Sequence, residues 1–181
     1  AKENPVGKNN DYEPERLAGV LELVREKSGY EQLKKSGNLG VSAYFCHDSY
    51  AAHVLDLEMK EGEPVVKKVW CAVDCGIVVN PDAAKNMAEG GIVDGIGTAL
   101  YGKITFSKGV PEANNFHAYR MIRHHEAPKA IQVDFVQSTL DPSGMGEPAY
   151  PPVFGALANA LYKATGKRFY KQPFIDLLQK S

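Results

Sequence analysis

The chain contains 181 residues, with a hydrophobic content of 44% and a formal net charge of −1. This length allows one substantial core or two small ones, and the near-zero charge argues against nucleic acid or an anionic membrane surface as a partner. No apolar run approaches the roughly 20 residues that a membrane span needs, and the first residues have no signal-peptide pattern. We therefore expect a soluble cytoplasmic protein, with periplasmic export of a longer parent protein left open.

An N-terminal helix and linker are predicted for residues 1–40. Proline and acidic residues in Glu13-Pro14-Glu15 favour the first turn of a helix. Apolar residues then recur at helical spacing, at Leu17, Val20, Leu21 and Val24. The glycine-containing run from Lys34 to Gly40 predicts a flexible connection. The second part of the chain is expected to span residues 41–181.

A β-hairpin with long strands is predicted for residues 41–73. The outgoing strand covers residues 41–60, a turn lies at Glu61-Gly62-Glu63-Pro64, and the return strand covers residues 65–73. Strands of this length usually need helices to cover them. His47 and His53 are separated by an even spacing, so in an unbroken strand both would face the same side of the sheet.

The sequence shows no recognisable metal site. His47 and His53 have no third ligand type nearby, so we interpret them as strand or rim residues. The cysteines are odd in number and form neither a zinc nor a disulfide framework, so we expect reduced, partly buried thiols at Cys46, Cys71 and Cys75.

A glycine-rich helix is predicted from Pro81 to Leu100, with Asn80 as its N-cap. Glu89-Gly90-Gly91 and Gly95-x-Gly97 place four glycines in its interior, where each costs about 1 kcal/mol relative to alanine. Two interpretations remain open. The glycines allow close packing against a strand or helix, or they allow the helix backbone to approach a cofactor.

Glu147 lies in the run Ser143-Gly144-Met145-Gly146-Glu147-Pro148, between an alternating strand at residues 131–136 and a final helix at residues 153–164. The glycines allow a tight turn and the approach of backbone N–H groups to a bulky ligand, and the prolines fix the geometry beyond them. A carboxylate held in this way could act as a general base. The alternative is a loop before the helix whose glutamate complements the helix dipole.

The order of these motifs resembles that of one enzyme family. The C-terminal part of the molybdopterin-binding large subunit of the xanthine dehydrogenase and aldehyde oxidase family has a similar succession, which here reads Asp74-Cys75-Gly76-x-x-x-Asn80-Pro81, Glu89-Gly90-Gly91, Gly144-x-Gly146-Glu147-Pro148 and Ala164-Thr165-Gly166-Lys167. The isoquinoline 1-oxidoreductase β-subunit branch is the most similar, and the resemblance extends from about Val6 to Pro173. We expect an α+β fold in which β-hairpins and a mixed sheet pack with helices in two layers, as part of a molybdenum cofactor-binding domain.

The resemblance implies a molybdenum hydroxylase, an oxidoreductase that hydroxylates an N-heterocycle or aldehyde carbon with oxygen derived from water. Glu147 would be the general base that takes a proton from a metal-activated hydroxyl group. The cofactor would be molybdopterin cytosine dinucleotide with molybdenum. Its binding residues would be Gly144, Met145, Gly146, Met87, Glu89, Gly90 and Gly91, and the chain would supply no metal ligand. The implied partners are the remainder of the large subunit, an iron–sulfur small subunit or electron-transfer domain, and a small aromatic heterocycle or aldehyde as substrate.

Two features depart from the family pattern. The family commonly has a glutamine two residues before Glu89-Gly90-Gly91, where Met87 stands here, and a thioether is a poor acceptor and no donor. The family's subunit is also several times longer, so we expect this chain to be a fragment that is inactive by itself. The alternatives are a cofactor-free binding or structural domain derived from the family, and an unrelated α+β module.

Overall fold

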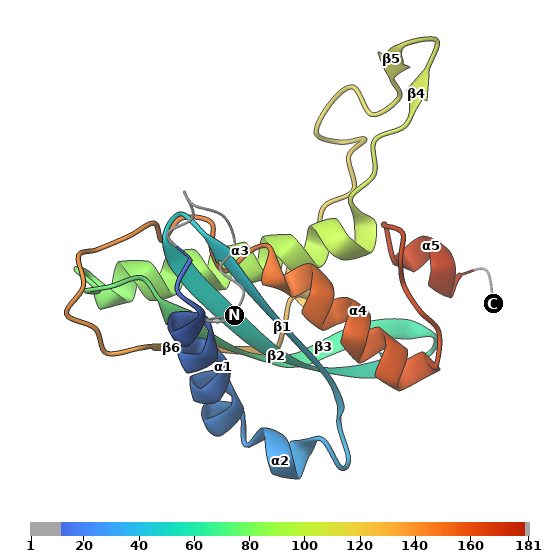
Figure 1. Cartoon of the computed structure of the whole chain (residues 1–181). Helices are drawn as coiled ribbons and strands as arrows, with labels where there is room; N and C mark the ends of the chain where they lie inside the picture. Colours follow the sequence, from blue (N-terminus) through green and yellow to red (C-terminus); the bar gives the residue numbers. More distant parts are fainter. Residues whose placement is uncertain (1–11, 180–181) are drawn as a thin grey trace.

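A computed structural model describes residues 12–179, so residues 1–11 of the predicted N-terminal segment, and with them the start of the resemblance at Val6, lie outside the described residues. The helices are α1 (Pro14–Ser28), α2 (Tyr30–Leu33), α3 (Pro81–Tyr101), α4 (Pro152–Thr165) and α5 (Ile175–Leu178), with a 3-10 turn at His124–Glu126 (Figure 1). The strands are β1 (Asn38–Cys46), β2 (Ser49–Lys60), β3 (Glu63–Asp74), β4 (Phe106–Ser107), β5 (Val110–Pro111) and β6 (Ala130–Phe135).

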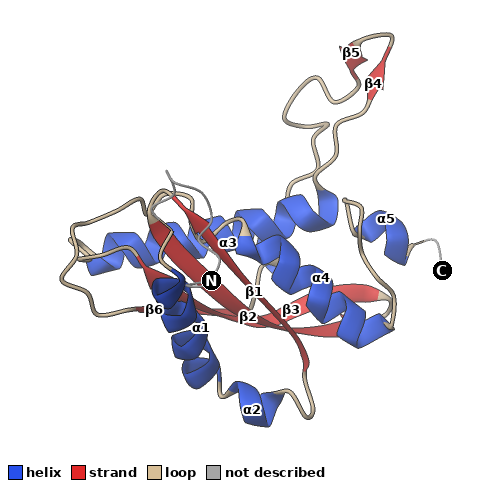
Figure 2. Cartoon of the chain, in the orientation of Figure 1, coloured by secondary structure: helices blue, strands red, loops and turns tan. Residues whose placement is uncertain are grey.

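The centre of the fold is a four-stranded mixed sheet with the order β1-β2-β3-β6 (Figure 2). β1, β2 and β3 form an antiparallel meander, and β6 pairs in parallel with β3. A parallel return needs a long crossover connection, which α3 and the segment after it provide. The short β4–β5 hairpin lies in this connection and projects away from the sheet. The predicted α+β class with a mixed sheet is confirmed.

The predicted outgoing strand at residues 41–60 is wrong in two respects. β1 begins earlier, at Asn38, so the end of the predicted flexible connection is a paired strand, and the outgoing strand is broken at His47 and Asp48. These two residues have φ angles of 53° and 56° and form the tight turn between β1 and β2. Turns with two positive φ angles match the twist of antiparallel strands, although Asn and Gly are the usual residues there. His47 is therefore a turn residue, and it does not share a strand face with His53.

Helices cover both faces of the sheet. The main core lies on the face covered by α3 and α4, and its buried residues include Leu55, Leu57, Val69, Ile92, Ile96, Leu157 and Leu161. α1 packs on the opposite face through a smaller core that contains Val20, Val24, Tyr50, Val54 and Trp70. The predicted packing of a mixed sheet with helices is confirmed, and α1 adds a further layer over β2 and β3.

Glycines set the closest approaches between these layers. A Cβ atom added at Gly40 of β1 would lie 1.8 Å from the backbone oxygen of Ala156, so α4 crosses β1 at backbone contact distance. On α3, a Cβ at Gly95 would lie 2.9 Å from the Cβ of Val153 on α4. The close-packing interpretation therefore holds for Gly95. It does not hold for Gly90, where an added Cβ would have no atom within 4 Å beyond its own stretch of helix.

His53 is a buried polar residue of β2. Its side chain has no exposed surface, and neither ring nitrogen has a hydrogen-bond partner among the described residues. Removal from water disfavours the charged ring and lowers the pKa of His53 from 6.5 to about 3. The ring stays neutral in the folded protein, whereas the unfolded chain takes up a proton there below about pH 6.5.

The protein is therefore expected to lose stability as the pH falls below 6.5. The His53 contribution should reduce the free energy of unfolding by at most about 1.4 kcal/mol per pH unit, down to a pH of about 3. Urea unfolding at a series of pH values measures this slope. A His53→Leu variant should show a smaller slope than the parent chain, and an unchanged slope would contradict the assignment to His53.

Candidate functional site

The loop that carries Glu147 docks against the β1–β2 turn and the end of β3. The backbone N–H of Ser143 donates to the oxygen of Cys75 at 2.9 Å, and the N–H of Gly144 donates to the oxygen of His47 at 3.0 Å. The hydroxyl of Ser49 donates to the backbone oxygen of Gly144 and lies 2.7 Å from the hydroxyl of Ser143. Segments distant in the sequence thus fix the start of the loop.

The Asp74-Cys75-Gly76 motif forms the turn beneath this loop. Gly76 has a φ of 69°, and an added Cβ would lie 2.1 Å from the oxygen of Asp141, so glycine is required there for two independent reasons. Arg16 binds the Asp74 carboxylate through two hydrogen bonds of 2.9 and 2.8 Å. Burial alone would raise the pKa of Asp74, but the bonds from Arg16 and from the Gly76 N–H outweigh it and lower that pKa. This motif therefore anchors α1 to the turn.

The glycine-rich part of α3 lies beside the same loop. A Cβ added at Gly146 would lie 3.9 Å from the terminal methyl carbon of Met87, and one added at Gly91 would lie 3.6 Å from the backbone nitrogen of Tyr150. Both are ordinary contact distances. The Asn80 side chain caps the helix by accepting from the N–H of Ala83 at 3.1 Å, as predicted.

The side chains around these glycines leave part of α3 open. Met87 is 48% exposed, and an added Cβ at Gly90 would meet no atom beyond its own stretch of helix within 4 Å. Glu89 forms an ion pair of 3.9 Å with Lys85 along the helix surface. Met145 is half-buried and packs against the main core. The backbone at Gly90 is therefore accessible to a bulky group.

Glu147 points away from the core and pairs with His47. The distance between His47 Nε2 and Glu147 Oε2 is 2.8 Å, and the two side chains are 59% and 76% exposed. The first turn of α4 begins at Pro152 and contains no acidic residue. The Glu147 carboxylate thus pairs with a side chain and lies outside the first turn of α4. Both observations count against the interpretation that it complements the helix dipole. His47 was missed as a partner of Glu147, because the two residues lie 100 positions apart.

The cysteines remain free thiols. Cys71 and Cys75 are buried and Cys46 is partly buried, as expected for reduced thiols. Burial raises the pKa of each thiol, with the nearby Glu147 charge as a second contribution at Cys46. Within residues 12–179, no group of three or more His, Cys, Asp or Glu side chains could hold a metal ion.

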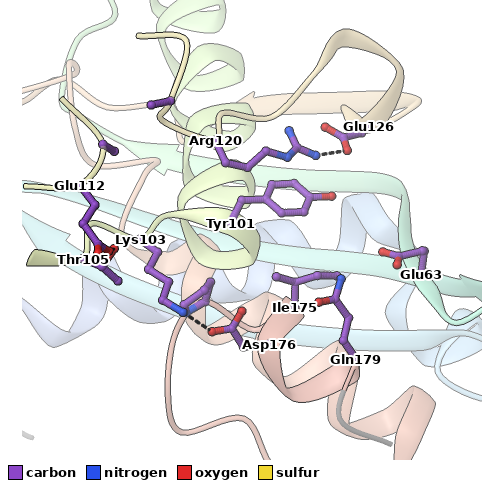
Figure 3. A pocket seen from close by; sticks show the side chains of 13 residues that line it. Glu63, Tyr101, Lys103, Thr105, Glu112, Arg120, Glu126, Ile175, Asp176 and Gln179 are labelled. Carbon is purple, nitrogen blue, oxygen red and sulfur yellow. Dashed lines mark hydrogen bonds and ion pairs between the residues drawn. The ribbon is translucent and has the colours of Figure 1, made fainter. Parts of the chain in front are cut away.

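A pocket of about 780 Å³ lies at the far end of α3, between the projecting segment and α5 (Figure 3). Four of its charged side chains form two ion pairs: Lys103 with Asp176 at 2.8 Å, and Arg120 with Glu126. Arg120 also stacks 4.0 Å above the ring of Tyr101, whose pKa burial raises to about 12. None of the predicted site residues lines this pocket.

None of the described helices has the length and apolar character that a membrane crossing requires.

Comparison with known proteins gives a consistent picture. The sequence model for the molybdopterin cofactor-binding domain matches residues 18–128. The beta subunit of isoquinoline 1-oxidoreductase from Brevundimonas diminuta is 32% identical over 164 residues, which cover 87% of this chain and 21% of that protein. The large subunit of nicotine 6-hydroxylase from Paenarthrobacter nicotinovorans is 28% identical over 136 residues, which cover 67% of this chain and 16% of that protein. The chain thus spans about a fifth or less of the length of these relatives.

Solved structures have the same fold. Quinoline 2-oxidoreductase from Pseudomonas putida 86 matches with a TM-score of 0.66 and 19% identity, over 74% of this chain and 18% of that one. Aldehyde oxidoreductase from Desulfovibrio gigas matches with a TM-score of 0.60 and 20% identity, over 72% of this chain and 15% of that one. At such low identities, these matches establish the fold alone.

Proposed function

Since this chain belongs to the molybdopterin cofactor-binding family of xanthine dehydrogenase-type molybdenum enzymes, we propose that it is part of the catalytic subunit of a molybdenum hydroxylase. The proposed reaction is the hydroxylation of an N-heterocycle or aldehyde carbon with oxygen derived from water. The remainder of the large subunit and an iron–sulfur subunit or domain would complete the enzyme. The cofactor would be the cytosine dinucleotide form of molybdopterin.

One observation carries the proposal: three segments far apart in the sequence meet at one site. A Cβ added at Gly146 would lie 3.9 Å from the methyl carbon of Met87 on α3, and one added at Gly91 would lie 3.6 Å from Tyr150 at the end of the Glu147 loop. The β1–β2 turn reaches the same loop through His47. The glycine loop and the open helix backbone would let a large anionic cofactor approach closely. The exposed carboxylate would serve as a proton acceptor.

The residues present fit such a cofactor. The open backbone at Gly90 would allow close approach along α3, and the exposed Gly146 would allow the same along the loop. Gly144 instead packs against His47, so it would hold the loop in place. When bound, the molybdenum cofactor supplies two-electron oxidation and activates water. Glu147 would accept the proton, because its carboxylate is exposed and its partner His47 binds one of its two oxygens. Met87 would provide an apolar contact in place of an amide.

A second candidate is a cofactor-free domain derived from this family. Met87 is the observation that favours it, because a thioether cannot donate a hydrogen bond to a pterin and accepts one poorly. The metal content of the full-length subunit distinguishes the two candidates, and a dye-reduction assay with N-heterocycles and aldehydes tests the reaction. A full-length wild-type subunit without molybdenum would favour the cofactor-free domain.

Gly90→Ala is expected to raise stability and to reduce cofactor retention. Alanine in a helix interior is favoured over glycine by about 0.5 to 1 kcal/mol, and the added methyl would meet no neighbour. The same methyl would occupy the space above α3 that the cofactor is proposed to use. Urea unfolding of the chain and the molybdenum content of the full-length subunit measure the two effects.

Gly19→Ala is the matched control for this substitution. Gly19 lies in α1, and an added Cβ there also meets nothing within 4 Å. The control should show the same gain in stability and an unchanged molybdenum content. If Gly90→Ala and Gly19→Ala retain equal amounts of molybdenum, the proposed approach of the cofactor at Gly90 is wrong.

A further inference from the structure

The tip of the β1–β2 turn touches the proposed base directly. His47 Nε2 lies 2.8 Å from Glu147 Oε2, although 100 positions separate the two residues. We infer that His47 is a positioning residue that holds the Glu147 carboxylate in one orientation. This inference rests on the proposed role of Glu147 as the general base.

The backbone holds the two residues together independently of their side chains. The N–H of Gly144 donates to the backbone oxygen of His47 at 3.0 Å, and a Cβ at Gly144 would lie 2.5 Å from the Cβ of His47. Ser49, at the start of β2, binds the same loop through its hydroxyl. An exposed contact between two polar side chains is by itself weak and variable. Here backbone contacts fix the start of the loop on the turn, so the backbones that carry His47 and Glu147 are already close before their side chains meet.

The conformation of His47 is uncommon for a residue other than glycine, although histidine adopts it more often than most. Its φ of 53° lies in the left-handed region, as does that of Asp48 at 56°. Asn and Gly satisfy such a turn at lower conformational cost than histidine. In this conformation the His47 ring reaches the Glu147 carboxylate.

The contact leaves Glu147 able to act as a base. Nε2 of His47 binds Oε2, and no hydrogen bond from the described residues reaches the other carboxylate oxygen. A free glutamate side chain samples several rotamers and loses this freedom when it reaches a reacting group. A partner that already holds the side chain in one orientation lowers that entropy cost. The nearby Cys46 thiol has a raised pKa, through burial first and the Glu147 charge second, so it is protonated and adds no competing negative charge.

Three substitutions separate the side-chain contact from the turn. His47→Asn suits the left-handed turn but is too short to reach Glu147, whereas His47→Gln places an amide N–H near the position of Nε2. Asp48→Asn is the control, because it changes the adjacent turn residue and leaves His47 in place. In the full-length enzyme, His47→Asn should lower kcat by about ten- to a hundredfold, with KM unchanged. His47→Gln should recover most of this loss, and Asp48→Asn should behave as wild type.

The contact can also be measured without turnover. The 15N resonances of the imidazole report hydrogen bonding at each ring nitrogen, and the His47→Asn spectrum identifies the His47 signals in the 181-residue chain. Glu147→Ala should shift the Nε2 resonance of His47, and Asp48→Asn should leave it in place. An Nε2 resonance that does not respond to Glu147→Ala would overturn the inference.

Failure of the inference is distinguishable from failure of the proposed function. Full kcat in Glu147→Gln would refute the general base itself. If Glu147→Gln is inactive while His47→Asn has the wild-type kcat, the positioning role is refuted and the base remains. If both hold, adding His47→Asn to Glu147→Gln should lower kcat no further, because the two residues act as one unit.

Discussion

Glu147→Gln in the full-length enzyme is expected to lower kcat by about 10²- to 10⁴-fold, the usual contribution of a general base. Glutamine keeps the shape and length of the side chain but cannot accept the proton. The melting temperature should stay the same, because the Glu147 side chain is 76% exposed and its partner His47 is also largely exposed. Steady-state kinetics with an accepted substrate and a thermal unfolding scan measure the two quantities.

The loss should appear in kcat and kcat/KM together, since the base acts in the transition state and contributes little to substrate binding. Glu26→Gln is a suitable control, because the Glu26 side chain on α1 is 77% exposed and lies outside the site. It should leave both kinetic constants unchanged. A Glu147→Gln enzyme with near-normal kcat would show that another group accepts the proton.

Gly40→Ala is expected to destabilise the chain by about 3 kcal/mol or more, at the upper end of the usual range for overpacking. The new methyl would lie 1.8 Å from the backbone oxygen and 2.8 Å from the carbonyl carbon of Ala156, and 2.5 Å from the backbone nitrogen of Ala160. Backbone atoms of a helix cannot move aside one at a time, so α4 as a whole must shift. Urea unfolding of the 181-residue chain measures the change.

The position of α4 also affects the functional site, because the Glu147 loop leads directly into this helix. A displaced α4 should increase amide hydrogen exchange in the loop at residues 143–150. Gly19→Ala provides the reference for a methyl that meets nothing within 4 Å, and it should stabilise the chain slightly. If Gly40→Ala unfolds at the same urea concentration as the parent chain, α4 does not cross β1 at backbone contact distance.

Local sequence patterns predicted the helices well, since helix signals act over a few residues. The periodic apolar residues placed α1, and Asn80 with Pro81 placed the start of α3. The helix predicted at residues 153–164 forms at Pro152–Thr165, but it is not the final one, because the short α5 (Ile175–Leu178) follows it. Gly166 ends it in the left-handed conformation, with a φ of 72°. The alternating pattern at residues 131–136 likewise corresponds to β6.

The candidate site was predicted in part. Glu147 and its glycines were identified from a loop motif, and the order of the motifs resembles that of the molybdopterin-binding family. Their cofactor and base roles remain predictions. What the sequence determined was therefore the local elements, the family and the set of candidate residues, each of which is encoded in short stretches of chain.

The tertiary structure decided how these pieces meet. The break at His47 was not predicted, because Asp48 without a following glycine is a weaker turn signal than an Asn-Gly or Asp-Gly pair. The sequence predicted a flexible connection at Gly40. Only the structure shows that the absence of a side chain there lets α4 approach β1 at the backbone oxygen of Ala156. The contact between His47 and Glu147 spans 100 positions and depends on β1, β2 and the loop together. Such contacts leave no local signal, because each depends on the packing of segments that fold together from distant parts of the chain.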